Sequence, residues 1–163
     1  MTKLTGYEEP LVVGFDSFYA EGWQPVYRAV AVVIRDRDLA GEAVDEAMVR
    51  AYRHWSSVSV MSNPRGWVYR VAVNWAKTRL KRRSMAGRLR LWSERPVDEP
   101  QLPDPELVAA VRTLPPDQRD VIVARYLFDM SQGEIAEAFG IKPGTVKSRL
   151  GRGLGRLRKE LST

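Results

Sequence analysis

Apolar residues recur at intervals of three and four positions through most of this chain, whereas alternating runs of β-branched residues are nearly absent. Spacing of three and four places apolar side chains along one face of an α-helix, while a half-buried strand needs strict alternation. Proline and glycine divide the periodic segments into lengths that are ordinary for helices. The pattern therefore predicts an all-α protein.

A proline-rich, acidic segment at residues 84–105 interrupts the helical pattern. It contains four prolines and three carboxylates close together, namely Pro96, Pro100, Pro103, Pro105, Asp98, Glu99 and Asp104. Such a stretch is stiff and packs poorly, so we expect a flexible linker between domains. The chain of 163 residues then divides into two small helical domains, 11–83 and 106–163.

Composition excludes several classes of function. The chain has no cysteine and a single histidine, His54, which removes thiolate chemistry, zinc ribbons and two-histidine metal sites. His54 is expected only to end a helix, and Asp and Ser form no catalytic spacing. We therefore expect that the protein is not an enzyme and that it binds no cofactor and no metal ion. Because there is no membrane-spanning apolar run and no signal-peptide pattern, we expect a cytoplasmic protein without a membrane span.

Basic residues are concentrated in two blocks. Residues 64–92 carry nine Lys or Arg and no Asp or Glu, and residues 121–163 carry eight against four. The segment 93–120 between them is acidic, and the net charge of the chain is +6. Two separate basic blocks indicate two contacts with a polyanion. The alternative is that these side chains only solvate helix surfaces, although solvated faces normally mix both signs.

The second predicted helix begins after a cap at Asp36 or Asp38 and reaches about Trp55. Its inward side is predicted to carry Ala43, Ala47, Ala51 and Tyr52. The polar residues 56–63, which include four serines, are predicted to form a loop.

A third helix is predicted to begin at Pro64, because proline is favoured in the first helical turn. Its apolar face includes Trp67, Val68, Val71, Ala72, Trp75 and Leu80. Another face carries Arg70, Asn74, Lys77 and Lys81. A helix with one apolar and one basic face suits docking along a phosphate backbone. A membrane-surface helix is the alternative, but tryptophans in the core of a helical bundle explain the apolar face better.

The C-terminal domain has the pattern of a helix-turn-helix motif. Ser131 and Glu134 fit a capping box before a short helix that ends at Phe139, and Gly140 provides the turn. The next helix begins near Pro143 and is expected to bury Val146, Leu150, Leu154 and Leu157. Its first two turns carry the candidate DNA-binding residues Thr145, Lys147, Ser148, Arg149 and Arg152. A basic second helix after a tight turn is typical of a recognition helix.

Three glycines lie farther along this helix, at Gly151, Gly153 and Gly155. Each glycine inside a helix costs roughly 1 kcal/mol relative to alanine. We therefore expect the C-terminal half of the recognition helix to be loosened.

These motifs together resemble those of the extracytoplasmic-function (ECF) sigma factors of bacterial RNA polymerase. Residues 114–122 (LPPDQRDVI) and 144–150 (GTVKSRL) resemble sigma region four, and residues 63–74 (NPRGWVYRVAVN) resemble sigma region two. The resemblance covers about residues 11–160. It implies a dissociable subunit that directs the polymerase to specific promoters and helps to open them, with region two at 11–83 and region four at 106–163.

The resemblance also implies what each surface contacts. Core polymerase would bind the second helix at Glu42, Asp45, Glu46, Val49 and Arg50. The downstream (minus-ten) promoter element would be contacted by Asn63, Arg70, Asn74, Lys77 and Lys81, and the upstream (minus-thirty-five) element by the recognition-helix residues given above. The implied partners are the bacterial RNA polymerase core, promoter DNA and an anti-sigma factor.

A dimeric helix-turn-helix regulator that acts without core polymerase is the alternative function. It would explain the C-terminal domain, but it would not explain the basic tryptophan helix or the linker. A symmetric dimer and a palindromic operator would favour it.

Overall fold

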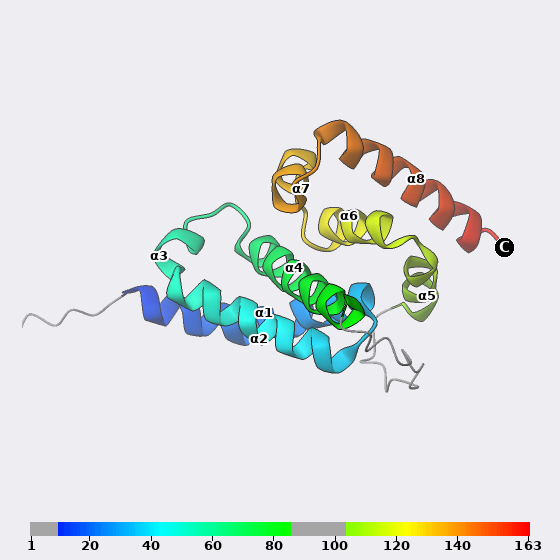
Figure 1. Ribbon diagram of the computed structural model, residues 1–163. Helices are drawn as coiled ribbons and strands as arrows, with labels where there is room; N and C mark the ends of the chain where they lie inside the picture. The colour runs from blue at the N-terminus through cyan, green and yellow to red at the C-terminus, as the bar shows by residue number, and fades with distance from the viewer. Residues whose placement is uncertain (1–9, 86–103) are drawn as a thin grey trace, which may run out of the picture.

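The computed structural model describes residues 10–85 and 104–163, and every regular element in these two ranges is an α-helix (Figure 1). The N-terminal lobe, residues 10–85, contains α1 (Pro10–Ile34), α2 (Arg37–Arg53), α3 (Trp55–Val58) and α4 (Pro64–Met85). The C-terminal lobe, residues 104–163, contains α5 (Pro105–Thr113), α6 (Pro116–Leu127), α7 (Gln132–Phe139) and α8 (Pro143–Leu161). The all-α prediction is confirmed, and most of the predicted linker lies outside the described residues.

The N-terminal lobe is a bundle in which α1, α2 and α4 pack against one another. Asp36 caps α2, because its side chain accepts a hydrogen bond of 2.9 Å from the backbone N–H of Leu39. The inward alanines of α2 are fully buried at Ala43, Ala47 and Ala51. Tyr52 was predicted to point inward as well, and this was wrong. Its side chain is 53% exposed and covers the edge of the bundle, with its ring 5.2 Å from that of Phe15.

The segment after α2 is more ordered than the sequence predicted. His54 ends α2, as expected. Residues 55–58 form the short helix α3, although residues 56–63 were predicted to be a loop, because Trp55 and Val58 are both buried against the bundle. The Trp55 ring lies 5.0 Å from Phe18, which holds this turn in place.

The C-terminal lobe contains the predicted helix-turn-helix. Ser131 and Glu134 form a reciprocal capping box at the start of α7, and Gly140 ends that helix with φ of 62°. The following helix α8 buries Val146, Leu150 and Leu157, while Leu154 is only partly buried. It packs closely on α6 at Gly153, where a Cβ would lie 2.9 Å from the side chain of Ile122.

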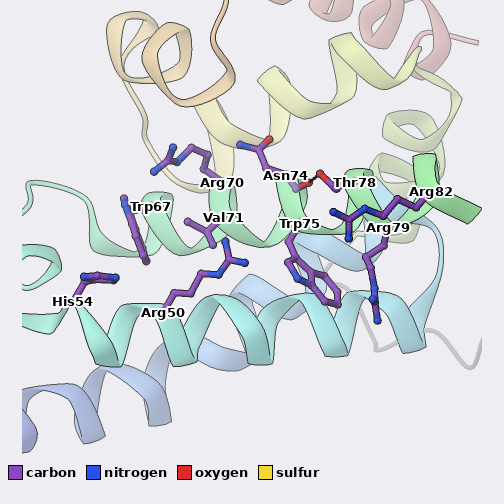
Figure 2. A pocket seen from close by; sticks show the side chains of 10 residues that line it. All are labelled: Arg50, His54, Trp67, Arg70, Val71, Asn74, Trp75, Thr78, Arg79 and Arg82. Carbon is purple, nitrogen blue, oxygen red and sulfur yellow. Dashed lines mark hydrogen bonds between the residues drawn. The ribbon is translucent and has the colours of Figure 1, made fainter.

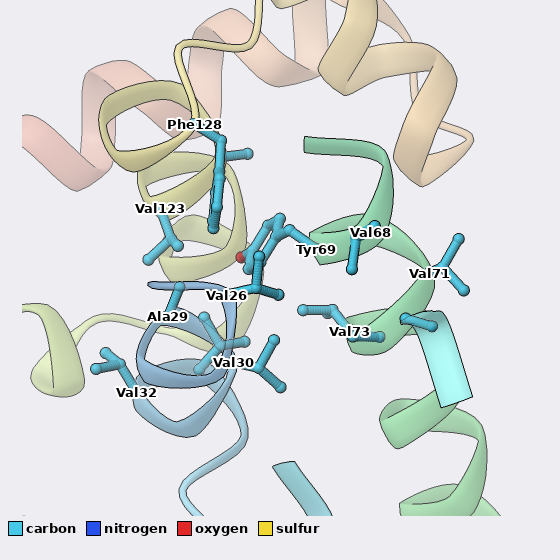
Figure 3. Close-up of a cluster of buried hydrophobic side chains, with 14 of the residues drawn as sticks. Val26, Ala29, Val30, Val32, Val68, Tyr69, Val71, Val73, Val123 and Phe128 are labelled. Carbon is cyan, nitrogen blue, oxygen red and sulfur yellow. The ribbon is translucent and has the colours of Figure 1, made fainter. Parts of the chain in front are cut away.

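The two lobes share one hydrophobic core, which the sequence did not predict (Figure 3). Val26 and Val30 of α1 and Tyr69 of α4 lie beside Val123 of α6 and Phe128, which follows α6. The Tyr69 ring is fully buried and stacks on that of Phe128, with 4.6 Å between the ring centroids. The lobes therefore pack against each other through α1, α4, α5, α6 and α7.

Candidate nucleic-acid interface

A basic groove lies between α2 and α4 and encloses about 540 Å³ (Figure 2). Its positive charges come from Arg50 of α2 and from Arg70, Arg79 and Arg82 of α4. It is also lined by Trp67, Trp75, Val71, His54, Asn74 and Thr78. Guanidinium groups can bind phosphates while aromatic faces stack on unpaired bases, so this combination suits single-stranded nucleic acid.

The two tryptophans of α4 pack against the core and at the same time line the groove. Both were predicted to face the core; each packs against it but remains partly exposed at the groove. Arginines accompany both rings: the guanidinium of Arg79 lies 4.9 Å from the Trp75 ring centroid, and that of Arg70 lies 6.0 Å from the Trp67 centroid. These contacts hold the arginines at the groove without neutralising them.

Arg50 and His54 belong to the groove because they lie one turn apart on the side of α2 that faces α4 (Figure 2). The sequence interpretation gave Arg50 only to the polymerase-binding set and gave His54 no role. Arg50 also pairs with Glu46, with 2.9 Å between Nε and Oε1. Because residues four positions apart lie on the same face of a helix, this spacing could have predicted that Arg50 and His54 line one surface.

The predicted downstream-element residues of α4 are divided between two environments. Arg70 and Asn74 line the groove, and Lys81 is exposed. Lys77 instead forms an ion pair with Asp120 of the other lobe. Asn63 accepts a hydrogen bond of 2.9 Å from the backbone N–H of Gly66, and its amide donates to the carbonyl of Phe128.

The predicted upstream-element residues gather on the first three turns of α8. Lys147, Ser148 and Arg152 are exposed, and Thr145 is partly buried. Arg149 differs from them, because its side chain is only 28% exposed and its Nε lies 3.4 Å from a carboxylate oxygen of Asp117. The structure thus brings these residues together and leaves most of them accessible.

The predicted polymerase-binding residues are all at least partly exposed on α2, although Arg50 also lines the groove towards α4. Glu42, Asp45, Val49 and Arg50 are exposed, and Glu46 is partly exposed. Asp45 accepts a hydrogen bond of 2.9 Å from the indole N–H of Trp23, which fixes the direction of its carboxylate. This surface is acidic at its N-terminal end and apolar at Val49, so it suits a protein partner with complementary charge.

Comparison with protein families matches two parts of the chain. Residues 19–85 match the model of Sigma-70 region 2, and residues 105–157 match that of Sigma-70, region 4. The RNA polymerase sigma-E factor of Streptomyces avermitilis is 30% identical over 168 aligned residues, which cover 93% of this chain and 87% of that protein. The ECF RNA polymerase sigma factor SigW of Bacillus subtilis is 31% identical over 85% of this chain and 82% of its own length.

The chain belongs to the ECF family of RNA polymerase sigma factors. As an ECF sigma factor it directs bacterial RNA polymerase to promoters for transcription initiation. The matches to both regions support this function and not the dimeric regulator considered from the sequence. The same fold is found in the sigma factor RpoE in complex with the anti-sigma factor NepR from Bartonella quintana, with a TM-score of 0.72 and 20% identity over 92% of this chain and 98% of that one.

Two neighbouring charged residues of this sigma factor are buried between the lobes, Arg119 and Asp120. The Arg119 guanidinium donates to the carbonyl of Val33 at the end of α1, at 3.0 Å, and to Arg112 and Leu114 within its own lobe. It therefore satisfies one of the carbonyls that a helix C-terminus leaves without an intrahelical partner. Burial lowers the pKa of Arg119, and the positive charge of Arg35 lowers it further.

Asp120 is the acidic counterpart on the same turn of α6. Burial raises the pKa of its carboxyl group, and the ion pair with Lys77 opposes this shift. The pKa of Tyr69 is also raised well above its ordinary value by burial and then by the nearby Asp120 charge. Sequence analysis missed both Arg119 and Asp120, because α6 also carries Asp117, Gln118 and Arg125 and nothing in the sequence distinguishes the buried charges from the exposed ones.

Among the described residues, no group of acidic, cysteine or histidine side chains could hold a metal ion. Within the same two ranges, no helix combines the length and hydropathy that a membrane crossing requires.

Proposed function

We propose that the two lobes divide promoter recognition between them. Residues 11–83 act as region two and residues 106–163 as region four, with the linker at 84–105 spanning the polymerase between them. The basic groove and the polar face of α4 take the downstream element, and the first three turns of α8 take the upstream element. The observation that carries this proposal is the groove itself, where cations of α2 and α4 flank two tryptophans.

In the downstream contact, the groove residues follow the backbone and stack on unpaired bases. The proposed set is Asn63, Arg70, Asn74, Lys77 and Lys81, to which the groove adds Arg50, Trp67 and Trp75. Aromatic stacking is worth about 1–3 kcal/mol per base and does not depend on base identity, whereas phosphate contacts make binding dependent on salt. Capture of an unpaired strand in this way helps to open the promoter.

In the upstream contact, Arg149 and Arg152 read base edges in the major groove, while Lys147 contacts phosphate. A planar guanidinium can form two parallel hydrogen bonds with guanine, whereas an ammonium is a point charge that positions without discriminating. Thr145 and Ser148 supply hydroxyl groups to the same surface.

In this proposal, core polymerase binds the exposed surface of α2 through Glu42, Asp45, Glu46, Val49 and Arg50, the last of which lies at the edge shared with the groove. The double substitution Asp45→Lys and Glu46→Lys should weaken holoenzyme assembly while leaving the fold intact, because exposed charges contribute little to stability. Charge reversal at Glu137, an exposed residue of α7, is the control. Unchanged assembly of the double variant would remove α2 from the polymerase interface.

The test of the whole proposal is transcription from candidate promoters by purified core polymerase with and without this protein. Promoter-dependent transcripts should appear only with the protein, and Arg70→Ala should reduce them while Arg53→Ala, an exposed arginine of α2 outside the groove, should not. Loss of one phosphate contact should reduce the dependence of binding on log salt concentration by about one. Equal activity of the two arginine variants would remove the groove from the DNA interface.

We further propose that the protein is not an enzyme, that it acts in the cytoplasm where the polymerase is found, and that an anti-sigma protein controls it. The structurally similar RpoE was crystallised with an anti-sigma factor, which supports the last point. A protein from the same bacterium that binds this chain and blocks holoenzyme assembly would establish it.

A further inference from the structure

Two neighbouring carboxylates of α2, Asp45 and Glu46, are held in different ways. Glu46 pairs with the cation Arg50 of its own helix, with 2.9 Å between Oε1 and Nε. Asp45 instead accepts a hydrogen bond from the indole N–H of Trp23 on α1, also at 2.9 Å. An indole is a neutral donor, so it orients the Asp45 carboxylate without cancelling its negative charge.

The Trp23 ring that makes this bond is itself supported by both helices. The ring of Tyr27, one turn later on α1, stacks on it with 5.0 Å between the centroids and 13° between the planes. The Tyr27 hydroxyl accepts a hydrogen bond of 3.4 Å from Nε of Arg37, the first residue of α2. A Cβ at Gly41 would lie 3.9 Å from the Tyr27 ring, so this ring also lies against α2. The indole that orients Asp45 is therefore restricted in its turn.

The hydrogen bond between Trp23 and Asp45 lies at the surface of the bundle. Asp45 is exposed and Trp23 is partly buried, whereas Ala43 and Ala47 of the same helix are fully buried. A hydrogen bond in contact with water adds little to folding, because water offers the carboxylate the same bond. Its main effect is on the freedom of the Asp45 side chain. A side chain that is already held in one direction loses less conformational entropy when a partner binds it.

We propose that Trp23 is a positioning residue for polymerase binding, which holds the Asp45 carboxylate in the direction from which a basic side chain of core polymerase approaches. This inference rests on the proposed function of α2. Trp23 leaves the charge of Asp45 in place, whereas Arg50 balances the charge of Glu46. A lysine or arginine of the partner therefore pairs with Asp45, and Trp23 raises the affinity through Asp45 rather than through a contact of its own.

The first test compares the two carboxylates by titrating the fluorescently labelled protein with purified core polymerase at constant salt. Asp45→Asn removes the charge but keeps an oxygen that can accept from the indole, and it should weaken binding by about tenfold. Glu46→Gln is the matched variant on the same turn, and its loss should be smaller, about threefold or less, because Arg50 already pairs with that charge. An equal or larger loss in Glu46→Gln would overturn the assignment of the cationic contact to Asp45.

The second test removes the indole N–H. Trp23→Phe keeps an aromatic ring against Tyr27 but loses the donor, so it should weaken polymerase binding by roughly threefold to tenfold. Tyr19→Phe is the matched control, because it removes one polar group from an aromatic residue one turn earlier on α1 that is 44% exposed. This control should bind as the parent protein does. Equal losses in the two variants would overturn the inference.

A double-mutant cycle separates positioning from a structural role or a direct contact. In Asp45→Ala there is no carboxylate to orient, so the addition of Trp23→Phe should weaken polymerase binding by less than about twofold further. A ring that touched the polymerase itself, or that only held α1 on α2, would cost the same factor with or without Asp45. Losses that multiply in the double variant would therefore overturn the inference.

A single-atom replacement keeps the test valid if Trp23→Phe fails to fold. Benzothienylalanine carries a sulfur in place of the indole N–H and has nearly the same shape, and suppression of a stop codon introduces it at position 23 alone. Thermal unfolding of this protein should match that of the parent, while its affinity for core polymerase should fall as in Trp23→Phe. Parent-like affinity with an unchanged unfolding temperature would overturn the inference.

The outcomes separate this inference from the proposed function. Weaker assembly of the double charge reversal at Asp45 and Glu46, together with parent-like binding by Trp23→Phe, would overturn the inference alone and keep α2 as the polymerase-binding surface. Parent-like assembly of the double charge reversal would remove α2 from the interface and overturn the inference with it.

Discussion

The two proposed DNA-binding helices of this sigma factor, α4 and α8, are both basic but are buried to different extents. In α4, three consecutive residues, Val71, Ala72 and Val73, are buried, and since each residue turns the helix by about 100° they cannot share one narrow stripe. In α8, the buried residues Val146, Leu150, Gly153 and Leu157 follow steps of four, three and four along a single stripe. The remaining surface of α8 is exposed to solvent for most of its length.

The difference teaches that charge identifies a surface suited to DNA but does not say whether that surface is accessible. Lys77 and Lys147 are both lysines on a predicted DNA-binding face. Lys77 is engaged by Asp120, whereas Lys147 is exposed. Only the packing of the two lobes makes this distinction.

The largest expected loss of stability comes from Tyr69→Ala, which tests whether the face of α4 towards the other lobe belongs to the hydrophobic core. Tyr69→Ala should lower the free energy of unfolding by about 3–5 kcal/mol, because it removes a fully buried ring that stacks on Phe128. Chemical denaturation measures this loss. Tyr126→Ala, which alters a tyrosine that is 57% exposed, should change stability by less than about 0.5 kcal/mol. Similar losses in the two variants would contradict the shared core.

The next prediction compares two arginines of α8. Arg152→Ala should relax preference at particular upstream bases, at a cost of roughly 1–3 kcal/mol there, while Lys147→Ala should weaken all promoters alike. Arg149→Ala should have the same effect as Arg152→Ala but a weaker one, because the guanidinium of Arg149 already pairs with Asp117. Initiation on a panel of upstream-element variants provides the measurement. Uniform loss of activity in both arginine variants, with base preference unchanged, would argue against direct readout.

Two glycines of α8 give opposite predictions for stability. Gly151→Ala should raise the free energy of unfolding by about 0.5–1 kcal/mol, since a Cβ there meets open space and alanine favours the helix. Gly153→Ala should lower it by about 1 kcal/mol, because its Cβ would lie 2.9 Å from the buried Ile122 and overpacking exceeds the gain in helix propensity. Thermal unfolding of the two variants should show shifts of opposite sign. Shifts of the same sign would mean that α8 does not approach α6 this closely.

The smallest effect concerns pH and the capping box of α7. Backbone hydrogen bonding from Ser131, and then the Ser62 hydroxyl, lowers the pKa of Glu134 below its ordinary value of 4.5. A carboxyl group whose pKa is lowered by folding stabilises the protein above its unfolded pKa, and this contribution is lost as the pH falls through the folded pKa. Glu134→Gln should therefore cost a few tenths of a kcal/mol at pH 7, after solvent screening is allowed for.

The difference between the parent protein and Glu134→Gln should begin to shrink as the pH falls below 4.5 and should vanish below the lowered pKa of the folded protein. Urea titrations at several pH values measure it, with Glu137→Gln on the same helix as the control. A constant difference across this range would mean that the charge of Glu134 does not stabilise the folded protein.

Local chemistry in the sequence was enough to predict most of the helices and several of their ends, although it missed the short helix α3. Asp36 and Ser131 cap helices because their side chains reach backbone N–H groups three residues ahead, and Gly140 adopts the positive φ that few other residues accept. The helix-turn-helix, and the grouping of Lys147, Ser148 and Arg152 on one exposed segment, follow from the same short-range rules.

The tertiary structure decided what covers each face. Tyr69 hydrogen-bonds to the backbone of Asp120, which is 51 positions away in the sequence. The apolar periodicity of either segment does not predict that the two segments pack together. For the same reason the sequence placed Tyr52 inside the bundle, although it is exposed, and did not predict that Trp67 and Trp75 face a groove as well as the core. Helix periodicity records that a face is apolar or basic, but whether solvent, DNA or another lobe covers that face depends on long-range packing.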